Sequence, residues 1–270
     1  MRGEDELVDD LVGAGVPRGG VLLVQSSLRS VGPVAGGADT VVRALRRALG
    51  PGGTLVVYTA TPENSRSSRL YREATAGMGA PERERHRAAM PAFDPATTPC
   101  SPSVGRLAEA VRTTPGALRS AHPQTSFAAV GPDARWIVED HRLDCHLGED
   151  SPLGRLYKLN ASALLVGIPD WLLTPYHLAD CRVPDPPRRP YTCLVRGADG
   201  ERRWIDFEGV DLDDRHFPVL GAAVRERVPF GEGRLGDADC LLVPIVPAVD
   251  AATDWLTGRR LSDEYSSHVL

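Results

Sequence analysis

The chain has 270 residues and lacks any run of about 20 consecutive apolar residues, the length that a membrane-spanning helix needs. Its first ten residues carry five acidic side chains and show no apolar core of a signal peptide. We therefore expect a cytoplasmic protein without a membrane partner. With 42% hydrophobic and 25% charged residues, the composition is typical of a soluble globular protein.

The sequence also lacks the spacings that hold metals and disulfides. Its five cysteines are scattered, odd in number and never spaced as CxxC, and its seven histidines form neither an HxH nor an HxxxH pair. We therefore expect reduced thiols and no metal site. A net charge of −5 argues against nucleic acid, whose phosphates need a basic surface. It fits a cationic small-molecule substrate, and equally the ordinary charge of a soluble protein.

What is present near the N-terminus is the pattern of a βαβ unit. Residues 21–24 form an apolar run, residues 40–49 place apolar side chains at helical spacing, and residues 54–58 form a second strand. Asp39 is a candidate N-cap, and Gly50 ends the helix. This order predicts an α/β protein with a partly parallel sheet.

Residues 60–100 show no periodicity and contain several prolines, which predicts a long irregular segment, either a disordered flap or a functional loop. Beyond it we expect helices at 104–112, 132–141, 175–181, 217–227 and 249–256, and strands at 127–130, 161–167 and 240–245. Residues 191–196 and 202–207 flank a Gly-Ala-Asp-Gly turn and predict an antiparallel hairpin. We expect one domain, residues 1–270, with a central mixed sheet flanked by helices and a small antiparallel element in the C-terminal third.

A polar, glycine-rich loop follows the first predicted strand. It comprises Ser26, Ser27, Leu28, Arg29, Ser30, Val31 and Gly32, and continues to Gly36 and Gly37 before the helix. Such a loop offers backbone N–H groups, serine hydroxyls and a helix N-terminus, which can hold the phosphates of a nucleotide-like cofactor. A tight βα turn would explain the same residues, and the loop matches neither a Walker A motif nor GxGxxG.

Two further polar segments allow more than one role. His122 precedes a proline at the entry to a strand, which favours a structural role, but we keep His122 and Ser126 as candidate cofactor contacts. Ser151 is a candidate N-cap with a proline at the first helical position. Glu149 and Asp150 just before that helix would favour its positive end or contact a cationic substrate.

The segment Thr174-Pro175-Tyr176-His177-Leu178-Ala179-Asp180 is the candidate catalytic motif. His177 and Asp180 are three residues apart and share one face if the segment is helical. A carboxylate beside an imidazole orients it and favours its action as a general base. Taken alone, such a pair is more often a surface contact.

Taken together and in order, several segments resemble the aminoglycoside 3-N-acetyltransferase family. The matching strings are SSLRSVGPVAGGADTVVRAL, GPGGTLV, FDPATTP, GRLAEAVRTTPGALRSAHPQTSFAAVG, LGEDSPLGRLYKL, LLVG and TPYHLAD, with a weaker match at RRWIDFEGVD. The stronger matches span about residues 20 to 182. This family is distinct from the acetyltransferases of the Gcn5-type fold.

The resemblance implies transfer of an acetyl group from acetyl-CoA to the 3-amino group of the deoxystreptamine ring of aminoglycosides. It implies that the cofactor lies near the loop from Ser26 to Gly37, that His177 is the base, and that Thr174 is a hydrogen-bond donor near the thioester carbonyl. Asp180 stands where the family has glutamate, and Gln25 where it commonly has histidine.

The resemblance leaves the acceptor and the transfer route open. We expect acidic and polar side chains to bind a cationic acceptor, namely Glu63, Asn64, Glu149 and Asp150. One alternative is a biosynthetic N-acyltransferase that acts on another amine or acyl-CoA. Others are an acyl-cysteine route through Cys181 or Cys145, and a non-catalytic protein that binds CoA or an antibiotic. A monomer and a homodimer are both compatible with the sequence.

Overall fold

The computed structural model describes residues 1–197 and 199–267. A seven-stranded mixed sheet forms its centre in the order β3-β4-β2-β1-β5-β9-β8. The strands are β1 (Val21–Ser26), β2 (Thr54–Tyr58), β3 (Leu118–Arg119), β4 (Phe127–Val130), β5 (Ser162–Val166), β8 (Gly231–Leu235) and β9 (Ala238–Pro244). The three central strands, β2, β1 and β5, are parallel, and all the other pairings are antiparallel.

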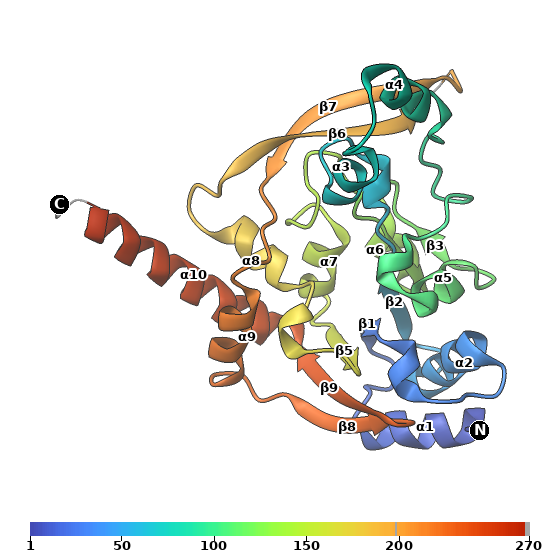
Figure 1. The fold of residues 1–270 in the computed structure, drawn as a ribbon. Helices are drawn as coiled ribbons and strands as arrows, with labels where there is room; N and C mark the ends of the chain where they lie inside the picture. The colour runs from blue at the N-terminus through green and yellow to red at the C-terminus, as the bar shows by residue number, and fades with distance from the viewer. Residues whose placement is uncertain (198, 268–270) are drawn as a thin grey trace.

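Helices cover both faces of the sheet (Figure 1). On one face α1 (Glu4–Gly13), α2 (Gly37–Leu49) and α5 (Arg106–Arg112) pack against Leu22 and Val24 of β1. On the other, α6 (Ala134–Val138), α7 (Pro152–Lys158), α8 (Tyr176–Arg182), α9 (Phe217–Arg225) and α10 (Ile245–Ser267) pack against Val21 and Leu23. Successive side chains of a strand point to opposite faces, so the continuous apolar run of β1 serves both layers.

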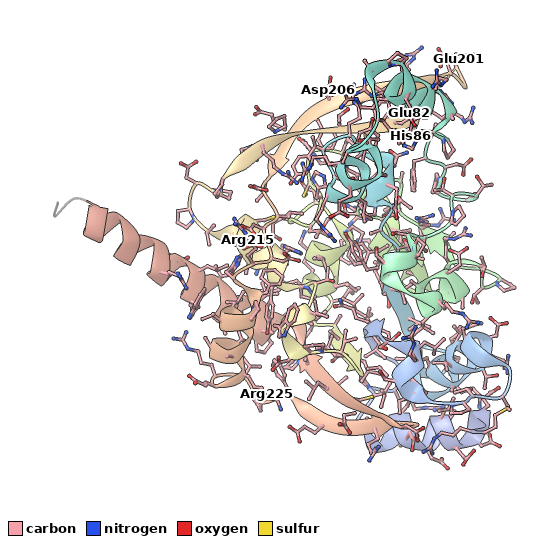
Figure 2. The ribbon with its side chains drawn as sticks, viewed as in Figure 1. Glu82, His86, Glu201, Asp206, Arg215 and Arg225 are labelled. Carbon is pink, nitrogen blue, oxygen red and sulfur yellow. The ribbon has the colours of Figure 1, made fainter. Side chains whose placement is uncertain are left out.

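A separate two-stranded sheet, β6 (Arg188–Arg196) and β7 (Arg202–Val210), projects from this body together with α3 (Arg69–Thr75) and α4 (Ala80–Ala89) (Figure 1). Tyr71, Met90 and Leu194 form a small apolar cluster there. Asn64 joins the two parts, because its side-chain amide donates to Leu194 O and accepts from Leu194 N, each at 2.9 Å. Figure 2 shows Glu82 and His86 on α4 in the same lobe as the hairpin.

The predicted mixed sheet and antiparallel hairpin are confirmed, but three local predictions are wrong. Helix α2 begins at Gly37 behind Gly36, whose φ of 76° suits glycine, so Asp39 lies inside the first turn and is not the N-cap. Residues 60–100 hold η2 (Pro62–Asn64), α3 and α4. The helix α4 buries none of its side chains, and its sequence accordingly lacks apolar residues at helical spacing. The third difference is the helix predicted at 132–141, of which α6 forms only the middle.

Short 3-10 helices lie on either side of the site described below. They are η1 (Leu28–Val31), η3 (Pro102–Val104) and η4 (Asp170–Leu172). In the described part of the chain, no helix has both the length and the apolar character that a membrane crossing requires.

Candidate active site

A cavity of about 390 Å³ opens at the carboxyl ends of β1 and β2. Gln25 and Ser26 from the end of β1 line it, together with Thr174, His177, Asp214 and Phe217. Ligand sites of α/β proteins form at this end of the parallel strands, where loops replace the hydrogen bonds of the sheet. The cavity therefore combines the predicted catalytic motif with the start of the predicted cofactor loop.

Gln25 fixes the segment that carries the catalytic motif. Its Nε2 donates to Leu172 O at 2.9 Å, and its Oε1 accepts from Thr174 N at 3.0 Å. Just beyond, Tyr176 is fully buried and packs edge-on against Phe217, with ring centroids 5.5 Å apart. These contacts hold the first turn of α8 over the end of β1, so that the next residue, His177, reaches the cavity.

His177 and Asp180 meet on one face of α8, as their spacing predicts. Nδ1 of His177 lies 3.1 Å from Asp180 Oδ2 in a hydrogen bond. A second histidine, His216, comes from the residue before α9, and its Nε2 lies 3.2 Å from Asp180 Oδ1. Asp180 is 8% exposed. Burial alone would raise the pKa of Asp180, but the two histidines outweigh it and hold the pKa below its usual value.

This arrangement gives His177 the geometry of a general base. When the carboxylate of Asp180 accepts the Nδ1 proton, the other ring nitrogen, Nε2, carries the lone pair. The ring also packs against Phe217, with centroids 4.6 Å apart, which limits its rotation. Because His177 lines the cavity, a substrate amine there can be deprotonated by a fixed imidazole.

The predicted cofactor loop lies beside this cavity. Ser26 lines it, Ser30 Oγ donates to Ser27 Oγ at 3.0 Å, and η1 carries the chain on towards α2. The N-cap of α2, Gly36, provides no side-chain cap for the first N–H groups of the helix. Those N–H groups and the serine hydroxyls suit the phosphates or amides of CoA. The chemistry of the loop thus fits acetyl-CoA.

His122 and Ser126 are not in this cavity. His122 is fully buried; its Nδ1 accepts from the backbone N–H groups of Gln124 and Thr125 at 3.1 Å, and its Nε2 donates to Leu143 O at 3.1 Å. Ser126 Oγ is also buried and donates to Thr59 O at 2.8 Å. Both side chains have structural partners, and their contact with the cofactor stays a prediction.

The residues predicted to bind the acceptor are spread over the surroundings. Glu63 and Asn64 line a neighbouring cavity of about 310 Å³, where Glu63 accepts a hydrogen bond from Ser101. Ser101 Oγ is 2.8 Å from the hydroxyl of Ser103, which lines the active-site cavity. The hydroxyls of Ser101 and Ser103 thus connect Glu63 with the wall of the active-site cavity.

Glu149 and Asp150 precede α7 and do not line the active-site cavity. Glu149 is paired with Arg182, with an N–O distance of 2.6 Å, and Asp150 is exposed. Their role in binding the acceptor stays a prediction. In contrast, the exposed carboxylate of Asp214 does line the cavity.

Sequence reasoning missed Asp214 and His216, and it treated Gln25 merely as a departure from a family pattern. The contacts of His216 and Gln25 join segments that are far apart in the chain, so no local spacing in the sequence predicts them. The residues 211–216 do form a run rich in acidic side chains that ends in a histidine. A search for titratable clusters outside the matched motifs would have singled it out.

Comparison with known proteins agrees with the geometry. The family profile described as aminoglycoside 3-N-acetyltransferase matches residues 23–257. Aminoglycoside N(3)-acetyltransferase III of Enterobacter cloacae is 40% identical over 271 residues, covering 88% of this chain and 92% of its own. The crystal structure of YokD from Bacillus subtilis superposes with a TM-score of 0.88 at 31% identity, covering 96% of this chain and 100% of that one. The structure of AAC-IIIb in binary complex with CoASH gives 0.82 at 29% identity, covering 96% and 97%.

The fold and the site therefore define an acyl-CoA-dependent N-acetyltransferase built on a mixed sheet of a type other than the Gcn5 fold. More narrowly, the chain belongs to the aminoglycoside 3-N-acetyltransferase family.

Proposed function

We propose that the protein transfers the acetyl group of acetyl-CoA directly to an aminoglycoside, at the 3-amino group of the deoxystreptamine ring, with His177 as the general base. The observation that carries this proposal is the hydrogen bond between His177 and the buried Asp180 at the wall of the cavity. The names of the relatives support an aminoglycoside as the acceptor.

In this reaction the ammonium group first loses one proton to solvent, because an ammonium ion has no lone pair with which to attack. His177 Nε2 then accepts the second proton as the neutral amine attacks. The amine nitrogen forms a bond to the thioester carbonyl carbon, and the bond from that carbon to sulfur breaks. The thiolate leaves with the proton that the imidazole has taken. We assign to Thr174 the donation of a hydrogen bond to the carbonyl oxygen as its charge develops; its place in the wall of the same cavity supports this role.

Asp214 extends the proposal to the acceptor. Aminoglycosides carry several ammonium groups, and Asp214 puts an exposed carboxylate at the wall of the cavity that holds His177. We assign it the anchoring of an ammonium group that does not react, with Glu63 and Asn64 contacting more distant parts of the acceptor. Glu149 and Asp150 would act at longer range through charge alone.

The test is release of free thiol from acetyl-CoA with a panel of aminoglycosides and unrelated amines, for the wild type and for His177→Ala. Release with deoxystreptamine antibiotics that disappears in the variant supports the proposal. Thiol release with other amines only would indicate a biosynthetic N-acyltransferase whose acceptor is not an aminoglycoside. Equal rates in the wild type and the variant would remove His177 as the base.

Direct transfer is favoured over an acyl-cysteine route. Burial raises the pKa of Cys181 to about 12, so its thiol is protonated and a poor nucleophile. Burial also raises the pKa of Cys145. Among the described residues that line the cavity there is no cysteine. Direct transfer requires that Cys181→Ala and Cys145→Ala keep the wild-type rate; an acetylated cysteine trapped in the absence of acceptor would contradict it.

A further inference from the structure

The carboxylate of Asp180 lies between two imidazoles that come from different elements. His177 on α8 approaches Oδ2 at 3.1 Å, and His216, at the start of α9, approaches Oδ1 at 3.2 Å. The ring of Phe217 lies beside both, with centroids 4.6 Å from His177 and 5.0 Å from His216. The two helices are thus joined at this carboxylate, and both of its oxygens have a histidine nitrogen beside them.

The two histidines face different cavities. His177 lines the cavity of about 390 Å³ described above. Asp180 and His216 line a second one of about 310 Å³, which Trp255 and Arg259 of α10 complete. His216 therefore lies behind the carboxylate as seen from the reacting groups, and it is not placed to touch an amine that His177 deprotonates.

Besides Asp180, the acidic residues that line the cavity of His216 have partners of their own. Asp211 pairs with Arg189 at 3.0 Å, and Asp213 with Arg215, which comes from the segment between β7 and α9 (Figure 2), at 2.8 Å. Asp214 lines the other cavity. Among the described residues, the carboxylate within ion-pair distance of His216 Nε2 is therefore that of Asp180.

A buried carboxylate held by a single hydrogen bond can turn about its side-chain bond, and its second oxygen then lacks a partner, which is costly. Asp180 is 8% exposed, so water does not replace such a partner freely. A donor on Oδ1 would remove this freedom and leave Oδ2 facing His177 Nδ1. His216 Nε2 lies 3.2 Å from Oδ1, and a small rotation of its ring would bring the N–H into line, since in this structure the contact is an ion-pair contact without hydrogen-bond geometry.

We propose that His216 is a positioning residue for the acetyl transfer. By holding Oδ1 of Asp180, it keeps Oδ2 on His177 Nδ1, so that His177 stays in the tautomer whose Nε2 is free to accept the proton of the amine. This inference rests on the proposed role of His177 as the base, but its structural part is measurable without any substrate.

The first test is the ¹⁵N spectrum of the imidazoles at alkaline pH, where neutral histidine tautomers are distinguished by the shifts of their two nitrogens. The signal of His177 is assigned with His177→Ala. We expect the wild type to show the Nδ1–H tautomer and His216→Ala to show a mixture of tautomers. His216→Gln retains an N–H donor at the position of Nε2 and is expected to restore the wild-type signal.

The second test is kinetic. In His216→Ala we expect kcat to fall about tenfold, with KM for acetyl-CoA unchanged within about twofold, and in His216→Gln most of kcat to return. The His216 side chain does not cap α9, so its removal leaves that helix start intact, and the melting temperature of each variant checks this.

The outcomes separate the two proposals. An unaltered His177 tautomer and unchanged kcat in His216→Ala would overturn the role of His216 and leave the acetyltransferase activity standing. If His216→Ala and His216→Gln lost the same amount of kcat while His177 kept its wild-type tautomer, His216 would contribute packing alone. That result would also overturn its proposed role as a positioning residue. If the wild type released no thiol with any amine, the proposed function would fail, and the spectra would still decide whether His216 holds the pair in place.

Discussion

The protein contains two groups of neighbouring histidines whose surroundings differ in kind. His122, His141 and His146 lie together in the core beneath the hairpin and are 0%, 8% and 5% exposed, with His122 4.7 Å by ring centroid from each of the other two. His177 and His216 lie at the cavities and share the carboxylate of Asp180. The contrast separates histidines with structural partners from the histidine that we propose as the base.

In the core group the partners of the rings are backbone and neutral side-chain atoms. His141 Nε2 donates to His146 O at 2.9 Å, and His146 Nε2 donates to Gln124 Oε1 at 2.6 Å. Among the described residues no carboxylate is hydrogen-bonded to these rings, so no negative charge offsets the burial of a positive one. Burial lowers the pKa of His141 to about 4 and that of His146 to about 3. These rings stay neutral and hold loops together.

In the site pair, the carboxylate of Asp180 accepts a hydrogen bond from the ring of His177, and that ring lines a cavity. In the proposed reaction, Asp180 would stabilise the positive charge that His177 acquires when it accepts a proton. A neighbouring carboxylate and a place in the cavity wall, more than burial, distinguish the histidine that we propose as the base. Four predictions test this comparison.

The largest effect should come from His177→Ala. Loss of a general base costs about 10²–10⁴-fold in rate, and we expect kcat to fall within that range. The melting temperature should change little, because His177 is partly exposed and its polar partner Asp180 keeps His216. A thiol-release assay with a thermal melt of the same sample measures both. A large loss of stability with full activity per folded molecule would place His177 with the structural group.

His122→Ala should show the opposite pattern. Removing a fully buried ring leaves the N–H groups of Gln124 and Thr125 without their acceptor, and we expect a loss of about 3 kcal/mol in the free energy of unfolding. Denaturant titration measures it. His122→Asn places an oxygen near the position of Nδ1 and should recover part of the loss.

The activity of folded His122→Ala provides the control, since a structural role predicts a wild-type kcat and an unchanged KM for acetyl-CoA. A raised KM at unchanged stability would instead support His122 as a cofactor contact.

The core group should also make stability depend on pH. Its folded-state pKa values lie below the ordinary histidine value of 6.5, so the unfolded chain binds more protons than the folded one between pH 6.5 and about 4. Stability is therefore full above pH 6.5 and falls as the pH is lowered, by up to about 1.4 kcal/mol per pH unit for each proton. Denaturant titrations at pH 7, 6 and 5 give the slope.

His141→Gln is the matched control for that slope. Glutamine keeps a donor for the carbonyl of His146 and removes one titrating group, so the slope should weaken while stability at pH 7 is largely retained. An unchanged slope in this variant would assign the acid sensitivity to other groups.

The same contrast explains how much the sequence could predict. The hydrogen bond from His177 to Asp180 is local and follows from a spacing of three residues on a helix, so it was predictable. The βαβ unit was predictable for the same reason, because apolar periodicity is a local signal. The second half of the site was not, since His216 reaches Asp180 through the packing of α9 on α8, and Gln25 reaches Thr174 across 149 residues.

Elements without an apolar period were missed as well. Helix α4 is polar on all sides and buries no side chain, so residues 60–100 read as irregular. The core group illustrates the same limit, because the pairing of His146 with Gln124 depends on loops brought together by the hairpin.

His86 on α4 (Figure 2) provides the smallest expected effect and completes the comparison. It is partly exposed, its ring lies 5.8 Å by centroid from Tyr71, and it lines the cavity that Glu63 and Asn64 also line. It has neither the carboxylate of the site pair nor the burial of the core group. We therefore expect His86→Ala to change the free energy of unfolding by less than about 0.5 kcal/mol and to leave kcat unchanged. Measured with a panel of acceptors, a rise in KM for large aminoglycosides alone would show that access to a ligand, without a carboxylate, is enough to give a histidine a role in binding but not in catalysis.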